Sequence, residues 1–232
     1  MPSLRGPREA FEAEDLHPAL WRAHQLGRQR EATCASGFPE LDAVLPGGGW
    51  PLRTLTELLL PHPGIGELRL LAPALADLQA RQRCVMLFDP PATPFAWAWG
   101  ACGLDVQQLF VVKSRNGVRG LPSADVLWAL EQALKSGHVG AVLAWLPLRL
   151  GADALRRLQL AAQAHDGPAF LLRDEPVRSK PSPAPLRLLL RPAGPDDLRV
   201  QVLKRRGPPL AQPLVLALAP VLPDALRQRV TA

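Results

Sequence analysis

The sequence predicts an α/β protein: a three-layer sandwich in which helices cover both faces of a mostly parallel central sheet. From residue 37 onward, short apolar segments alternate with longer amphipathic ones. This alternation is typical of βαβ units, whose parallel strands are buried on both faces. A chain of 232 residues, 47% of them hydrophobic, is also long enough to bury such a core as one domain.

The expected elements follow one another in a regular order. A short helix and the glycine turn PGGGWP precede an apolar strand, TLTELLL, and an amphipathic helix, GELRLLAPALADLQARQ. Next come the strand CVMLFD, the helix PFAWAWGACG, the strand QQLFVVK, the helix SADVLWALEQALKSG, the strand VGAVLAWL, the helix GADALRRLQLAAQAHDG and the strand PAFLLR. After a proline-rich loop, PLRLLLRP and DLRVQVLKRR flank the turn PAGPD and predict a hairpin.

Both ends of the chain are expected to be additions to this core. Residues 1–36 predict an N-terminal helical arm and linker, residues 37–206 the core, and residues 207–232 a C-terminal tail. Because an isolated helix as short as that of the arm is marginal in water, it must dock on something. Folding of both ends back onto their own sheet explains their apolar residues equally well. The residues that could instead form a protein interface are Leu20, Trp21, Leu26, Leu214 and Leu216.

Composition sets broad limits on function. Three well-separated cysteines and scattered histidines predict neither a disulfide framework nor a metal site. No signal peptide and no apolar segment of membrane-spanning length is present, so we expect a cytoplasmic protein without a membrane partner. The net charge of +6 permits contact with nucleic acid, and nearly all of the excess lies in residues 173–206, with nine Lys or Arg and four Asp or Glu.

The segment PHPGIGEL, with Gly64 at its centre, lies where a phosphate-binding loop is expected, between a buried strand and a helix. Nucleotide-binding P-loops have the pattern GxxxxGK[ST], in which Lys and the hydroxyl serve phosphate and Mg²⁺. Here Pro61 replaces the first glycine, Gly66 keeps the second, and Glu67 and Leu68 replace Lys and Ser/Thr. Glu67 would repel a triphosphate, and Leu68 cannot bind Mg²⁺.

A second position supports the same conclusion. In P-loop enzymes an Asp at the end of an apolar strand holds Mg²⁺, but the corresponding strand here ends in Ala144 and Trp145. No other catalytic constellation is recognisable. We therefore expect neither a cofactor nor enzymatic activity, and we keep a divergent nucleotide site as the alternative.

The order of elements from GFPELDAVLPGGGWP to VGAVLAWL resembles the core of RecA-like recombinases. The turn at residues 47–51, the tryptophan-bearing arm and the altered P-loop most resemble the ImuA family, accessory proteins of bacterial SOS mutagenesis. The resemblance covers about residues 16–206 and implies a RecA-like sandwich that acts as a non-catalytic mutasome adaptor in translesion DNA synthesis and DNA repair. The implied partners are an ImuB-like inactive Y-family polymerase homologue, RecA and, indirectly, an error-prone DnaE-type polymerase.

Two other functions are compatible with the same core. The sister family of ImuA is SulA, the SOS cell-division inhibitors, and a SulA-like protein would bind FtsZ, although SulA-type chains are shorter and lack the long tail. A divergent ATPase or recombinase would instead bind nucleotide.

The late basic residues predict either weak, sequence-independent DNA or partner binding or an ordinary solvated face. In RecA-like proteins, basic residues near the corresponding strand reach a neighbouring protomer's nucleotide, and nearby loops hold single-stranded DNA. The basic residues concerned are Arg173, Arg178, Lys180, Lys204, Arg205 and Arg206.

Overall fold

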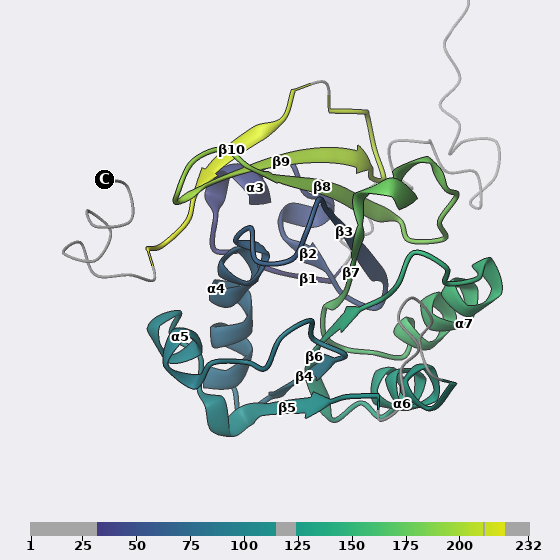
Figure 1. Cartoon of the computed structure of the whole chain (residues 1–232). Helices are drawn as coiled ribbons and strands as arrows, with labels where there is room; N and C mark the ends of the chain where they lie inside the picture. Colours follow the sequence, from purple (N-terminus) through teal and green to yellow (C-terminus); the bar gives the residue numbers. More distant parts are fainter. Residues whose placement is uncertain (1–31, 115–123, 211, 221–232) are drawn as a thin grey trace, which may run out of the picture. The chain divides into compact units, whose positions relative to one another are not determined.

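The structure, a computed structural model, describes residues 32–114, 124–210 and 212–220 (Figure 1). Its main feature is an eight-stranded sheet in the order β10-β9-β8-β3-β7-β6-β4-β5. Neighbours from β8 to β5 are parallel, whereas β9 pairs antiparallel with both β8 and β10. The strands are β3 (Leu55–Leu60), β4 (Cys84–Phe88), β5 (Leu109–Val112), β6 (Val139–Trp145), β7 (Ala169–Asp174), β8 (Leu186–Pro192), β9 (Asp197–Lys204) and β10 (Leu214–Ala217). The predicted α/β class with a mostly parallel sheet is confirmed.

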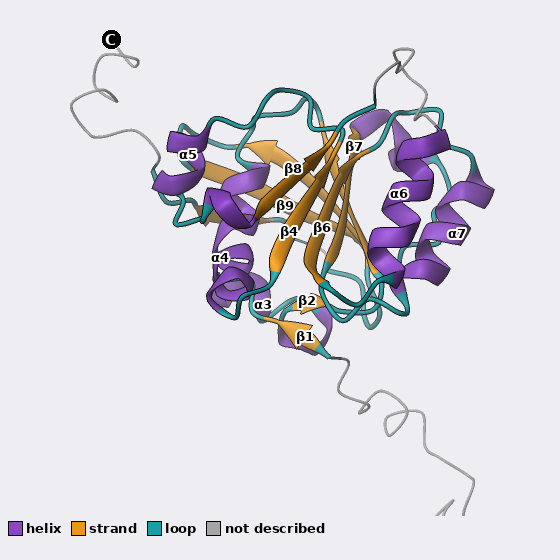
Figure 2. Cartoon of the chain, turned by 90° about the horizontal axis from the view of Figure 1, so that it is seen from below, coloured by secondary structure: helices purple, strands orange, loops and turns teal. Residues whose placement is uncertain are grey.

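Helices cover both faces of the sheet, as Figure 2 shows. One face carries α3 (Pro39–Asp42), α4 (Glu67–Ala80) and α5 (Ala96–Ala101), and the other carries α6 (Ala124–Lys135) and α7 (Ala152–Ala162). Each face has its own buried apolar cluster. None of the described helices has the length and apolar character needed to cross a membrane.

The central strand β3 shows why these residues form a buried parallel strand. Every residue of β3 is buried, and successive side chains point to opposite faces. Leu58 and Leu60 therefore join the cluster under α4, whereas Leu55 joins the cluster under α6 and α7. β3 ends at the loop that precedes α4, which is the expected position of a P-loop.

The predicted hairpin is confirmed by the antiparallel pair of β8 and β9. Its proline-rich approach is not wholly irregular, because Glu175–Ser179 forms a short 3₁₀ helix, η3. β10 then pairs with β9, and Leu216 and Leu218 are buried in the cluster under α4.

The proposed interface at the C-terminal end therefore needs correction. Leu216 is buried and Leu214 packs against the same cluster, so these side chains stabilise their own sheet and are not free for a partner. The strand β10 pairs along its whole length with β9. The interface residues predicted in the arm, Leu20, Trp21 and Leu26, lie outside the described residues.

The glycine turn at residues 47–51 has a local structural explanation. It links the 3₁₀ helix η1 (Pro46–Gly48) to β2 (Trp50–Pro51), which pairs with β1 (Thr33–Cys34) in a separate two-stranded sheet. A Cβ atom at Gly49 would lie 2.3 Å from the carbonyl oxygen of Cys34, so no larger residue fits there. Trp50 is fully buried with its ring edge-on to Phe170, at a centroid distance of 5.2 Å.

Candidate functional site

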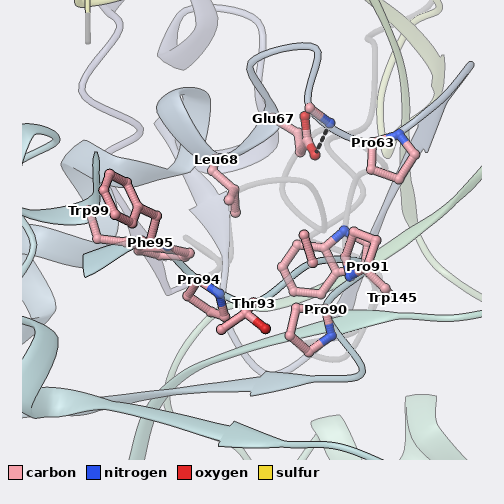
Figure 3. A pocket seen from close by; sticks show the side chains of 12 residues that line it. Pro63, Glu67, Leu68, Pro90, Pro91, Thr93, Pro94, Phe95, Trp99 and Trp145 are labelled. Atoms are coloured by element: carbon pink, nitrogen blue, oxygen red, sulfur yellow. Dashed lines mark hydrogen bonds between the residues drawn. The ribbon is translucent and has the colours of Figure 1, made fainter. Parts of the chain in front are cut away.

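The parallel strands β3, β4 and β6 all end at the same edge of the sheet. Ligand sites of parallel α/β proteins usually lie at this edge. Here the edge holds a cavity of about 320 Å³ (Figure 3). The cavity is lined by Pro63, Gly64, Glu67 and Leu68 around the start of α4, by residues 90–95 after β4, and by Trp99 and Trp145.

The side chain of Glu67 holds the loop between β3 and α4 through a hydrogen bond to the loop's backbone. Its Oε1 accepts a hydrogen bond from the backbone N–H of Gly64 at 2.8 Å, and its side chain is almost completely buried. Gly64 and Gly66 both have positive φ, of 88° and 110°, which favours glycine at these positions. In a P-loop the backbone N–H groups would face phosphate, whereas here one of them is already bonded to a carboxylate.

The walls of the cavity are apolar. Leu68 occupies the position of the P-loop hydroxyl, and prolines, which have no N–H to donate, form much of the opposite side (Figure 3). Trp145, the last residue of β6, adds an indole ring to the lining and no carboxylate for a metal ion. The cavity is therefore suited to apolar or aromatic groups, and its chemistry differs from that of a phosphate site.

Two polar atoms on the cavity's residues lack hydrogen-bond partners. Oε2 of Glu67 and Nε1 of Trp145 are both buried, and neither has a partner among the described residues. Buried polar atoms are normally satisfied, so each unpaired one requires an explanation. One is an acceptor and the other a donor, on residues that both line one cavity.

The sequence analysis missed the aromatic residues beside the cavity. Trp99 is buried in the cavity wall, whereas Phe95 and Trp97 are 69% and 55% exposed. The sequence pattern predicted only a helix here, which is confirmed as α5. The proline-rich segment DPPATPF followed by two tryptophans could have indicated an apolar surface, because large exposed aromatics are uncommon on a solvated helix.

One residue of the predicted basic patch is not on the surface. Arg173 is only 4% exposed, and its Nη1 lies 3.0 Å from Oε1 of Glu57. Arg187, which the patch did not include, pairs with the other oxygen of Glu57 at 2.6 Å. These three residues lie on the adjacent strands β7, β3 and β8 and form a buried ion network. Arg173 is therefore structural, and its assignment to an exposed patch is wrong.

The other basic residues of the predicted patch do not share a common partner, and three of them donate to backbone carbonyls in different parts of the chain. Lys180 donates to the carbonyl of Leu148, and Lys204 donates to that of Ser182. Arg205 instead donates to the carbonyl of Val44, just after α3. Arg178 and Arg206 are exposed. The described structure thus gives these side chains several separate local contacts.

The region that contains the cavity matches the model of one protein family. Residues 55–169, which contain every residue that lines the cavity, match the family model described as "Cell division inhibitor SulA". This range of the chain is similar to SulA proteins. It is 33% identical over 106 residues to the cell division inhibitor SulA of Edwardsiella piscicida, and 39% identical over 67 residues to that of Photorhabdus laumondii.

These matches cover part of each protein. The first spans 46% of this chain and 59% of the Edwardsiella protein, and the second spans 29% of this chain and 37% of the Photorhabdus protein. The chain therefore aligns with less than two thirds of either relative. The range that matches the SulA family model extends from β3 to the start of β7.

The preferred interpretation of the sequence, an ImuA-like mutasome adaptor, is corrected by this result. The family model and both relatives are cell division inhibitors, so the expected ImuB-like, RecA and DnaE-type partners are wrong as well. The turn at residues 47–51 contributed to the error. It lies outside the matched range, and its glycines and tryptophan are explained by local packing.

Proposed function

We propose that this protein is a SulA-like cell-division inhibitor that acts in the cytoplasm, as part of the SOS response, by binding FtsZ. The observation that carries the proposal is the match of residues 55–169 to the SulA family model. The proposal includes a RecA-like arrangement of the core, supported by the position of the loop after β3, directly before α4.

The proposed mechanism is binding without catalysis. Glu67 uses one carboxylate oxygen to hold the loop, and Leu68 and Trp145 supply no ligand for phosphate or Mg²⁺. We therefore infer that inhibition comes from occupation of an FtsZ surface, with no hydrolysis of nucleotide by this chain. A stoichiometric inhibitor of this kind requires an exposed surface with enough apolar area to hold its partner.

We place that surface at Phe95 and Trp97, beside the cavity. Both side chains are more than half exposed and both belong to the matched range. Exposed aromatics are frequent hot spots of protein interfaces, because they bury a large area with little loss of conformational entropy. Trp128, on α6, is 63% exposed and also lies in the matched range, so it provides a matched comparison.

The test is a binding titration of the purified chain against FtsZ. Trp97→Ala should weaken binding by about 30-fold, corresponding to a hot spot of about 2 kcal/mol. Trp128→Ala, which removes an equally exposed tryptophan from the other side of the sheet, should leave the affinity unchanged. If both variants bind like the original chain, the assignment of the surface fails; if the original chain does not bind FtsZ, the proposed function itself fails.

A further inference from the structure

The segment that carries the exposed aromatic residues begins at a strained position. Asp89, directly after β4, has a φ of 47°, in the left-handed region that residues with a side chain rarely adopt. Among the described residues other than glycine, only Arg53 and Gln82 also have positive φ. Such strain persists where surrounding contacts hold the backbone in place, and it is concentrated at functional sites. The contacts of Asp89 therefore indicate what this strained backbone does.

The contacts that hold Asp89 come from the end of β5. Its backbone N–H donates to the carbonyl of Val112 at 2.8 Å, which extends the pairing of β4 with β5 by one residue. Its side-chain Oδ1 accepts a hydrogen bond from the backbone N–H of Ser114 at 2.7 Å. Asp tolerates the left-handed conformation because its short polar side chain can bond to nearby backbone. The two bonds fix the direction in which the chain leaves β4.

The residues after Asp89 have little conformational freedom. Residues 90–95 read PPATPF, and each of the three prolines fixes its φ near about −65° (Figure 3). The hydroxyl of Thr93 accepts a hydrogen bond of 3.3 Å from Nζ of Lys113, which lies just after β5. The segment is therefore attached to the end of β5 at two points, the carboxylate of Asp89 and the hydroxyl of Thr93.

The exposed aromatics lie between this attachment and a buried anchor. Phe95 is the N-cap of α5, and Trp97 is the second residue of the helix. Trp99 is only 6% exposed, and its backbone N–H donates to the carbonyl of Phe95 at 3.2 Å. Phe95 and Trp97 are thus fixed from both sides before any partner binds. A surface ordered in advance loses less conformational entropy on binding.

We propose that Asp89 is a positioning residue for the surface formed by Phe95 and Trp97, with Lys113 in a supporting role. Asp89 acts through residues 90–95 and orders the two aromatic side chains before the partner arrives. The inference rests on the proposed function, because that function places FtsZ at this surface. One of its two tests needs no FtsZ.

The first test measures hydrogen exchange of the Trp99 amide by NMR, because this amide reports the hydrogen bond to Phe95. Asp89→Gly accepts the positive φ but removes the carboxylate, so the segment should open more often and the amide should exchange about tenfold faster. Gln82→Gly is the matched control, since Gln82 has a φ of 60° and lies just before β4, at its other end. It should leave the exchange rate unchanged.

The second test measures the rate constants of binding to FtsZ. Loss of advance ordering lowers the fraction of free chain that can bind, so Asp89→Gly should slow association about tenfold and leave dissociation unchanged. Loss of a contact acts mainly on the other rate, so Trp97→Ala should chiefly speed dissociation. Asp89→Asn keeps an acceptor oxygen and tolerates the left-handed backbone, so it should recover most of the association rate.

Lys113→Met covers the case in which Asp89→Gly does not fold. It changes an exposed residue and removes only the bond to Thr93, so association should slow by a smaller factor, about threefold. Equal Trp99 exchange in Asp89→Gly and Gln82→Gly would overturn the proposal, as would association of Asp89→Gly and Lys113→Met at the original rate. If the original chain does not bind FtsZ, the proposed function fails, and the exchange rates alone decide whether Asp89 orders the segment.

Discussion

Replacing Glu57 by Gln is expected to destabilise the core strongly. Glu57 is fully buried in the central strand, and its two oxygens pair with Arg173 at 3.0 Å and Arg187 at 2.6 Å. Glutamine keeps the size of the side chain but leaves two buried guanidinium groups without a counter-charge. Loss of one partner of a buried ion pair costs about 3–5 kcal/mol. For a domain of this size, that corresponds to a fall in melting temperature of about 6–20 °C.

Urea unfolding followed by circular dichroism measures this effect, with Glu131→Gln as the matched control. Glu131 also has two cationic partners, Lys135 and Arg157, whose hydrogen bonds lower its pKa, but both partners are largely exposed. Its replacement should therefore cost far less than that of Glu57. Equal losses in the two variants, with unchanged m-values, would refute the assignment of a stabilising role to the buried network.

An apolar replacement of all three buried residues should recover only part of the stability. Removal of a whole buried ion network is often neutral, because the desolvation cost disappears with the charges. Arg187, however, also donates to three backbone carbonyls in and beside η3, those of Val177, Arg178 and Lys180. These carbonyls would lose their donor, so the triple variant should remain less stable than the original chain.

Three further predictions concern the stability of the core. Gly49→Ala should lower the melting temperature by several degrees, because its Cβ would clash with the backbone of Cys34, whereas Gly151→Ala has open space and should not. Truncation after Gly207 should destabilise the core in the same melting assay, because it removes β10 and the buried side chain of Leu216, whereas truncation after residue 220 should not. Burial lowers the pKa of His165 to about 4, below its unfolded value of about 6.5, so the unfolded state takes up a proton first as pH falls. The free energy of unfolding should therefore decrease between pH 6.5 and 4, by at most about 1.4 kcal/mol per pH unit, and His165→Leu should abolish this decrease.

The sequence predicted the architecture well because local patterns determine it. The run LTELLL predicted a buried strand, and the turn PAGPD between two apolar segments predicted the hairpin. The same patterns could not show what Glu57 does inside its strand. Its partners, Arg173 and Arg187, lie 116 and 130 residues away in the sequence, so only the strand order brings them together.

The sequence indicated which loop contributes to the candidate site, but it did not indicate the aromatic residues that line the cavity. The sequence analysis singled out the loop after β3 and Trp145 because of the altered P-loop pattern, and residues of both line the cavity, but it did not predict the cavity itself. The aromatic wall was missed, because Trp99 and Trp145 come from separate elements that meet only in the folded chain. The apolar residues of β10 suggested an interface for a similar reason, since an edge strand and a docking segment have the same composition.

The most direct test of inhibition by FtsZ binding is sedimentation of FtsZ polymers in GTP, with increasing amounts of the purified full chain. We predict that the pelleted fraction of FtsZ falls as the chain approaches equimolar amounts, and that Trp128→Ala inhibits equally well while Trp97→Ala inhibits much less. An unchanged pellet at a severalfold excess of folded chain would contradict the proposed function.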